Sequence, residues 1–110
     1  MVLTSVPQAD GTVKNRPAIV LREMPVYRDV LVCGVSTQLH QYVPGFDDLI
    51  APADADFAAS GLVAPSLIRL GFLAVVPRRN ILGTIGAIAP ERHKRLLQAL
   101  SNYLLRNLGS

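Results

Sequence analysis

The chain has 110 residues, half of them hydrophobic, and its eleven Lys and Arg against eight Asp and Glu give a formal net charge of +3. This length fits one domain, which we expect to span residues 1–110, and so small a domain leaves much of its surface exposed. The apolar excess therefore favours a self-association surface, and the mild basic excess favours a polyanionic partner such as nucleic acid.

The residue pattern also excludes several classes of protein. Cys33 is the one cysteine, so no intrachain disulfide forms, and its apolar neighbours predict a small buried residue on a strand. The N-terminus has no basic region followed by a long apolar run, so we expect no secretory signal. The longest apolar tract, residues 61–76, contains Pro65 and Arg69 and is shorter than the roughly 20 residues of a spanning helix. We therefore expect a cytoplasmic protein without membrane contact.

Short apolar runs separated by turn residues fill the first three quarters of the chain, which is typical of a small β-barrel or sandwich. Strands are predicted over residues 2–6, 17–23, 29–36, 62–69, 71–77 and 82–88. Turns are predicted at Asp10-Gly11 and at residues 78–80, and Gly34 predicts a bulge or a close backbone approach. Because most connections are too short for crossovers, the strands are expected to be antiparallel.

Two cations precede the second predicted strand. In "GTVKNRPAIVL", residues 11–21, Lys14 and Arg16 lead into Pro17 and a β-branched segment. Pro17 cannot donate a ladder hydrogen bond, so it is tolerated only at the first position of a strand or at an edge. Arg16 is therefore predicted to lie at the mouth of this strand.

A long helix is predicted only at the C-terminus, where Pro90 suits the first helical turn and Glu91 the positive end of the helix dipole. Leucines at three- and four-residue spacing are expected to pack into the core: Leu96, Leu97, Leu100, Leu104 and Leu108. Arg92, Lys94 and Arg95 form either a solvated helix surface or a basic face for RNA. Arg69 is a candidate salt-bridge partner of Asp56.

The connection over residues 38–62 is longer than a simple link between two strands needs to be in a compact domain, so it is predicted to carry functional residues. No metal or cofactor site is predicted in it or elsewhere. Two separated histidines, Cys33 and the pair Asp47-Asp48 lack the spacing of a zinc ligand set or of a calcium loop.

Three blocks of sequence resemble one family: "DGTVKNRPAIVL" at residues 10–21, "DVLVCGVSTQ" at 29–38 and "DFAASGLVAPSLIRL" at 56–70. In this order, with the closing helix, they closely resemble the MazF/PemK-like toxins of bacterial type II toxin–antitoxin systems over nearly the whole chain. Family members usually begin with residues such as R-G-D or R-G-E. This chain starts at Met1-Val2-Leu3-Thr4, so either the first strand is short or the start lies upstream.

The resemblance implies a fold, an activity and partners. The fold is mainly β, an antiparallel SH3-like β-barrel with a C-terminal α-helix, and the protein is a homodimer. The activity is that of a metal-independent endoribonuclease, which cleaves single-stranded RNA (mRNA) and leaves a 2′,3′-cyclic phosphate and a 5′-hydroxyl. A cognate antitoxin protein inhibits the enzyme, and DNA contact is expected only through the antitoxin complex.

The resemblance also assigns two catalytic positions. The arginine of the family's R-P pair matches Arg16, and the first hydroxyl residue of its T-x-Q pattern matches Ser36, where the family usually has threonine. Thr37 follows directly, and because adjacent strand residues point to opposite faces, one of the two hydroxyls is expected to face the phosphate. We favour Ser36. Arg16 offers a planar fork of donors to phosphate oxygens and is a poor base, since its pKa lies above ~12, so we expect charge stabilisation or proton donation from it.

Neighbouring residues are candidates for RNA contact. Lys14 adds charge for the RNA backbone, and Gln38, Gln41 and Tyr42 either bind unpaired bases or simply fill the loop. The general base is unassigned, and His40 is a candidate because its pKa permits acid–base work.

Two other interpretations stay open. A non-catalytic SH3-like RNA- or protein-binding module would keep the barrel and lose the nuclease activity, because a fold does not fix function. A small RNA-binding protein would recognise RNA without cutting it. Arg16 together with a hydroxyl at Ser36 favours the ribonuclease.

Overall fold

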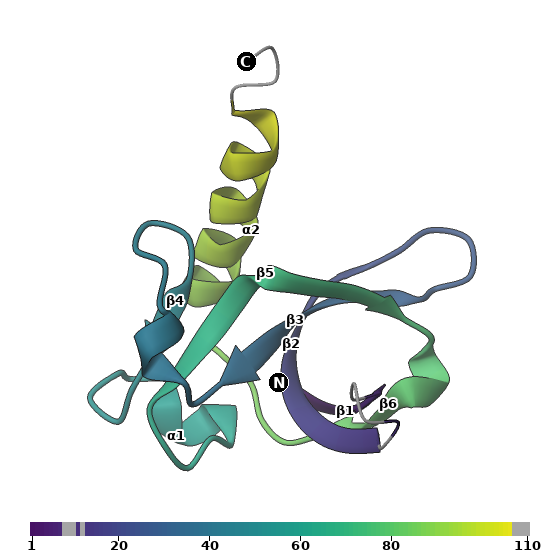
Figure 1. Cartoon of the computed structure of the whole chain (residues 1–110), viewed down its shortest axis with the longest axis horizontal. Coiled ribbons are helices and arrows are strands. Elements are labelled where there is room, and N and C mark those ends of the chain that lie inside the picture. The colour runs from purple at the N-terminus through teal and green to yellow at the C-terminus, as the bar shows by residue number, and fades with distance from the viewer. Residues whose placement is uncertain (8–10, 12, 107–110) are drawn as a thin grey trace.

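The computed structural model describes residues 1–7, 11 and 13–106. Its elements in chain order are β1 (Val2–Pro7), β2 (Val13–Glu23), β3 (Val30–Ser36), the 3₁₀ helix η1 (Leu39–Gln41), β4 (Asp48–Ile50), α1 (Phe57–Ser60), β5 (Ser66–Val76), the 3₁₀ helix η2 (Arg78–Asn80), β6 (Ile81–Thr84) and α2 (Pro90–Leu105) (Figure 1). The strands form one sheet in the order β4-β5-β3-β2-β1-β6, and every neighbouring pair is antiparallel. The predicted antiparallel β fold with a C-terminal helix is confirmed.

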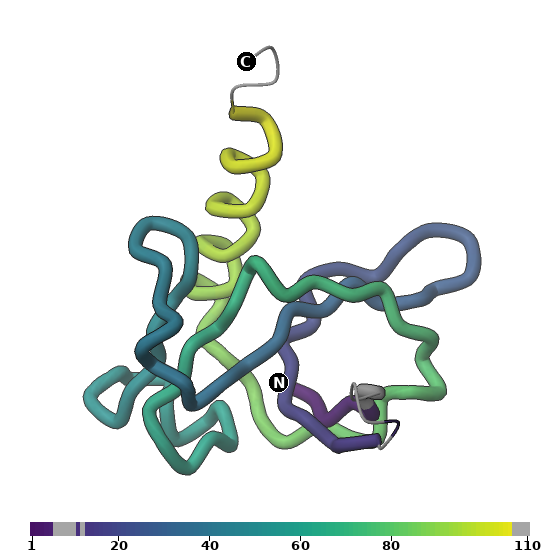
Figure 2. The backbone as a smooth tube through the Cα atoms, viewed as in Figure 1, coloured from purple at the N-terminus to yellow at the C-terminus, as the bar shows by residue number. Residues whose placement is uncertain are grey.

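The sheet is strongly curved. Figure 2 shows the chain curling from β5 through β3 and β2 to β1 and β6. Among the strands of the described residues, no pairing joins β4 at one edge to β6 at the other, so closure of the predicted barrel is not observed. The first strand is formed over Val2–Pro7, and it pairs with both β2 and β6.

The prediction of two strands over residues 62–69 and 71–77 is wrong. β5 is one strand, and it begins directly after Pro65, which has no N–H to give to a ladder. The residues before Pro65 are needed to end α1, where Gly61 takes the left-handed conformation at φ 81°. The two predicted runs are therefore the end of a short helix and one long strand.

The register of β5 against β3 shifts in the middle of this long strand. Cys33 pairs with Leu73, whereas the next residue of β3, Gly34, pairs with Arg69. Residues 70–72 therefore bulge out of the ladder, and the irregularity predicted at Gly34 is confirmed. The turn predicted at residues 78–80 is confirmed as η2, and the turn at Asp10-Gly11 lies partly outside the described residues.

The last strand is shorter than the predicted range of 82–88, because the chain leaves the sheet to cross α1. β6 ends at Thr84, and Ala87 N–H then donates to Ala59 O at 2.8 Å. A Cβ atom at Gly86 would lie 2.3 Å from Ala59 O, so only glycine permits this crossing. β4 was not predicted, since three residues carry too little alternation to be recognised.

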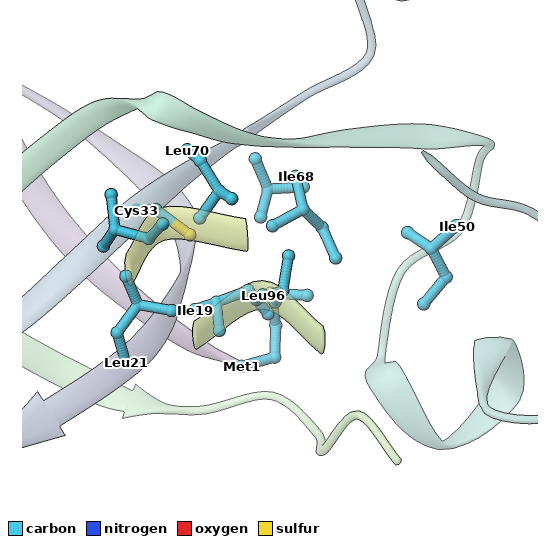
Figure 3. Close-up of a cluster of buried hydrophobic side chains, with 10 residues drawn as sticks. Met1, Ile19, Leu21, Cys33, Ile50, Ile68, Leu70 and Leu96 are labelled. Carbon is cyan, nitrogen blue, oxygen red and sulfur yellow. The ribbon is translucent and has the colours of Figure 1, made fainter. Parts of the chain in front are cut away.

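One face of the sheet packs against α2 and forms the main core. Side chains from β2, β3, β5 and the helix meet there, among them Ile19, Leu21, Cys33, Ile68, Leu70 and Leu96 (Figure 3). The predicted leucine packing is confirmed at Leu96 and Leu100, which are buried, but is wrong at Leu104, which is 60% exposed. The second half of α2 extends past the sheet (Figure 1), so no strand covers it. Leu108 lies outside the described residues.

Candidate functional site

The second face of the sheet carries a polar row across β1, β2 and β3. Thr4 pairs with Arg16, and Ala18 pairs with Gly34. Because β2 and β3 are antiparallel, Arg16 and Ser36 each lie two residues beyond the Ala18–Gly34 pair at the same end of the ladder. An offset of two keeps a side chain on the same face of the sheet, so Arg16 and Ser36 lie on the face of Ala18 and Gly34, just past the last β2–β3 pair.

Both side chains line a hollow of about 510 Å³, a volume that suits a small ligand or part of a larger one. Its polar lining residues are Thr4, Ser5, Arg16, Ser36, Gln38, Gln41, Arg69 and Asn80. Ala18 and Val32, from a small apolar cluster on this face, line it together with Phe72. No Asp or Glu appears among its described lining residues, whereas two arginines do, so the hollow favours an anionic group.

The hydroxyls at positions 36 and 37 are separated by the end of β3, because Ser36 is the last residue of the strand and Thr37 lies in the bend that follows it. Ser36 lines the hollow, and its Oγ accepts a hydrogen bond from the N–H of Gln38 at 3.1 Å. Thr37 is exposed and lies outside the hollow. Of the two, only Ser36 shares this surface with Arg16.

Only some of the predicted RNA-contacting residues line the hollow. Gln38 at its start and Gln41 at its end line the hollow. His40 and Tyr42, on and after η1, are exposed outside it, as is Lys14 on β2. The structure thus brings two of these five candidates beside Arg16 and Ser36.

Most lining residues were not predicted as parts of a site, among them Arg69, Phe72 and Asn80. Asn80 was assigned only to a turn, and Arg69 only to a salt bridge. The register shift at Gly34 decides which β5 side chains reach this face, and its size cannot be found from residue alternation alone. The cation Arg69 within an apolar strand was the available signal.

Arg92 forms a separate ion cluster that holds the loop before α1 to the start of α2. Its Nε and Nη2 donate to Asp56 at 2.8 and 3.0 Å, and its Nη1 donates to Asp48 at 2.7 Å. These hydrogen bonds from Arg92 are the main reason that the pKa of Asp56 falls to about 2, and Asp56 in turn raises the pKa of Arg92. Arg95 adds a second bond to Asp48 at 2.9 Å.

This cluster corrects two predictions. Arg92 is only 7% exposed, so it belongs neither to a solvated helix surface nor to a basic face for RNA. The salt-bridge partner of Asp56 is Arg92 rather than Arg69. His93, next in the helix, lies with Nε2 3.0 Å from Val20 O and so links α2 to the sheet.

The remaining reactive or metal-ligating side chains form no second candidate site in the described part of the chain. Cys33 is buried, as predicted, and burial raises the pKa of its thiol to about 12. Within residues 1–7, 11 and 13–106, no group of three or more His, Cys, Asp or Glu side chains is arranged to hold a metal ion. None of the helices in the described part of the chain is long and apolar enough to cross a membrane.

The chain is similar in sequence and in fold to proteins of known families. A family model described as "PemK-like, MazF-like toxin of type II toxin-antitoxin system" matches residues 1–104. The solved structure of the Mycobacterium tuberculosis toxin MazF-mt6 is similar at a TM-score of 0.65 and 20% sequence identity, covering 94% of this chain and 96% of that one. At that identity the likeness shows the fold alone. A comparison with curated proteins found no match. The resemblance inferred from the three sequence blocks is confirmed.

Proposed function

Because the chain belongs to the PemK-like, MazF-like toxins of type II toxin–antitoxin systems, we propose that it is an endoribonuclease that cuts single-stranded RNA such as mRNA. The observation that carries this proposal is that Arg16 of β2 and Ser36 of β3 line one hollow, two residues past the Ala18–Gly34 pair. A guanidinium and a hydroxyl on one face supply donors to a phosphate from two strands held rigid by their ladder. No acidic side chain among the described lining residues opposes an incoming phosphate.

The reaction uses the nucleophile already present in RNA. The 2′-oxygen attacks the adjacent phosphorus, the bond from phosphorus to the 5′-oxygen breaks, and the products are a 2′,3′-cyclic phosphate and a 5′-hydroxyl. In this proposal Ser36 and Arg16 stabilise the charge that develops on the phosphate oxygens, or Arg16 instead donates a proton to the leaving 5′-oxygen. Neither His40 nor His93 lines the hollow. The acceptor of the 2′-hydroxyl proton is left unassigned.

This chemistry asks nothing of a metal ion, since proton transfer and charge stabilisation are sufficient for attack by a neighbouring hydroxyl. We therefore expect the enzyme to act in the presence of a chelator. A guanidinium is suited to this role because its planar fork of donors matches the geometry of phosphate oxygens.

We further propose a cytoplasmic homodimer whose activity a cognate antitoxin inhibits, with DNA contact only through the antitoxin complex. Large exposed side chains on α2, Tyr103, Leu104 and Leu105, and on the β2–β3 connection, Val26 and Tyr27, supply apolar surface for protein contacts. A hollow lined by arginines also suits an acidic peptide that orders on binding. RNA and such a peptide are expected to compete for the groove that includes Lys14, Arg16 and residues 38–55.

The direct test is to incubate the purified chain with a long single-stranded RNA in excess chelator and to analyse the fragment ends. We expect discrete cuts that leave 2′,3′-cyclic phosphates and 5′-hydroxyls, and no cut where the scissile nucleotide is 2′-deoxy. Cleavage of the deoxy substrate, or loss of activity on chelation alone, contradicts the mechanism. Binding of RNA without any cutting would favour the non-catalytic module.

A further inference from the structure

The proposed catalytic pair occupies only part of the hollow, and an aromatic side chain lies elsewhere in its lining. Phe72 belongs to residues 70–72, which bulge from β5 where the register against β3 shifts. Its side chain is 49% exposed, an unusual state for a phenylalanine in the middle of a long strand. The bulge thus presents an aromatic ring on the surface that Arg16 and Ser36 share.

Gly34 fixes the place of this ring. A Cβ atom added at Gly34 would lie 2.8 Å from Phe72 Cδ1, closer than side-chain carbons approach one another. The ring therefore rests directly on the backbone of β3, and a larger residue at position 34 would displace it. Gly34 is also two residues from Ser36 along β3, so the ring lies next to the proposed catalytic row.

Arg69 adds a hydrogen-bond donor beside the ring. It pairs with Gly34 in the ladder and lines the same hollow. Among the described residues that are not exposed, its Nε is the buried side-chain nitrogen for which no hydrogen-bond partner is found. No acceptor of the described residues therefore holds the guanidinium of Arg69 at its Nε, and a guanidinium has further N–H donors that can meet a ligand in the hollow.

We propose that Phe72 and Arg69 form a nucleobase subsite, in which a base next to the cleaved bond stacks on the Phe72 ring and accepts a hydrogen bond from Arg69. Every base has a flat face and an edge with acceptors, and stacking on aromatic rings with edge hydrogen bonds is how single-stranded RNA is read. Arg69 donates only, so the subsite selects for the acceptors that a base presents at that edge. The inference rests on the proposed function, and it names Phe72 and Arg69 as determinants of base preference.

A nucleobase fits these observations better than an apolar peptide side chain. An apolar side chain would cover the ring but would offer no acceptor to Arg69, which lines the same hollow. A base satisfies both, and the phosphate attached to it then lies toward Arg16 and Ser36, which line the same hollow.

The test compares Phe72→Leu, which removes the ring, with Phe72→Tyr, which keeps it, and with Val75→Ala as a matched control. Val75 lies on the same strand, is 54% exposed and does not line the hollow. Binding is measured with 2′-O-methyl oligonucleotides rich in each base in turn, which attack by a 2′-hydroxyl cannot cleave. Cleavage is measured by mapping the fragment ends of a long RNA.

We expect Phe72→Leu to bind the preferred oligonucleotide roughly 5- to 100-fold more weakly, the effect of removing one stacked base. It should also lose base preference at one position beside the cut, whereas Phe72→Tyr and Val75→Ala keep both properties. Circular dichroism of each variant checks that the sheet is intact. Loss of preference is a result that a purely structural role of the ring would not produce.

The outcomes separate this inference from the proposed function. A Phe72→Leu variant with unchanged affinities and unchanged cut sites overturns the subsite and leaves the ribonuclease proposal standing. Base-selective binding that depends on Phe72, in a wild-type chain that never cuts RNA, supports the subsite and overturns the catalytic proposal. Weaker binding of an acidic peptide by Phe72→Leu, with RNA binding and cleavage unchanged, assigns the ring to a protein partner and overturns the subsite.

Discussion

Replacing Arg92 by methionine is expected to destabilise the protein far more than an ordinary helix substitution. The guanidinium makes four hydrogen bonds of 2.7 to 3.0 Å, two of them to Asp56, one to Asp48 and one to the carbonyl of Leu49, and its side chain is 8% exposed. Removing one partner of such a buried pair leaves the carboxylates uncompensated, at a cost of about 3–5 kcal/mol. For a domain of this size, each ~1 kcal/mol lowers Tm by about 4–8 °C.

Urea unfolding followed by circular dichroism measures this loss, with Lys94→Met as the matched control. Lys94 is an exposed cation two residues on in the same helix, so its replacement is expected to change the free energy of unfolding by less than about 0.5 kcal/mol. If Arg92→Met cost no more than Lys94→Met, the ion cluster would not be what fastens residues 48–56 to α2.

The same cluster sets the stability in acid. The pKa of Asp56 is about 2 in the folded chain against 3.8 ordinarily, so its ion pair contributes about 2 kcal/mol at pH values above ~4. Because the folded pKa is the lower one, this contribution falls progressively from about pH 4 and is gone below pH 2. Asp56→Asn should therefore be less stable than the wild type at pH 6, with the difference shrinking between pH 4 and pH 2. A difference that stays constant over that interval would contradict the assigned pKa.

Three further outcomes follow from the site and the core. Ser36→Ala should lower RNA cleavage by about 10²-fold while Thr37→Ala stays close to wild type, because only Ser36 lines the hollow; a greater loss for Thr37→Ala in a gel assay would show that the other hydroxyl acts. Lys14→Glu should weaken both RNA and an antitoxin peptide and reduce the salt dependence of RNA binding, since fewer counterions are released. An unchanged slope of affinity against salt would remove Lys14 from the RNA groove. Cys33, buried with a pKa near 12, should react with a thiol reagent only on unfolding, and rapid labelling of the native chain would contradict its burial.

The strands whose apolar runs are long and unbroken were predictable from the sequence. Residues 17–23 and 29–36 lie within or overlap β2 and β3, because β-branched residues there are buried on both faces. The predicted start at Pro17 is wrong, since β2 begins at Val13 and Arg16 lies inside the strand, paired with Thr4, rather than at its mouth. The division of β5 into two strands failed at Gly71, which local sequence marks as a break. In the structure the strand continues because the break is absorbed as a bulge against β3. The fate of residues 85–88 depends on contact with α1, which no local pattern specifies.

In the candidate site too, some residues could be assigned from the sequence, whereas others depend on contacts between distant parts of the chain. Arg16 and Ser36 were assigned through the family resemblance, and the structure separates Ser36, which ends β3 and lines the hollow, from Thr37, which lies beyond the strand and outside the hollow. Phe72 and Arg69 could not be assigned, because the face that they occupy is set by a register shift between strands more than 30 residues apart in the chain. The burial of Arg92 likewise depends on three aspartates from residues 48–56, which begin at β4 and lie more than 30 residues before α2.

The most direct test of the central claim is the rate of RNA cleavage by Arg16→Ala. Arg22→Ala is the control, because Arg22 is an exposed cation on the same strand that does not line the hollow. If Arg16 stabilises the phosphate charge in the transition state, its loss should lower kcat/KM by at least ~10²-fold, while the circular dichroism spectrum stays that of the wild type and Arg22→Ala cuts normally. Cleavage by Arg16→Ala at a rate close to that of the wild type would contradict the account.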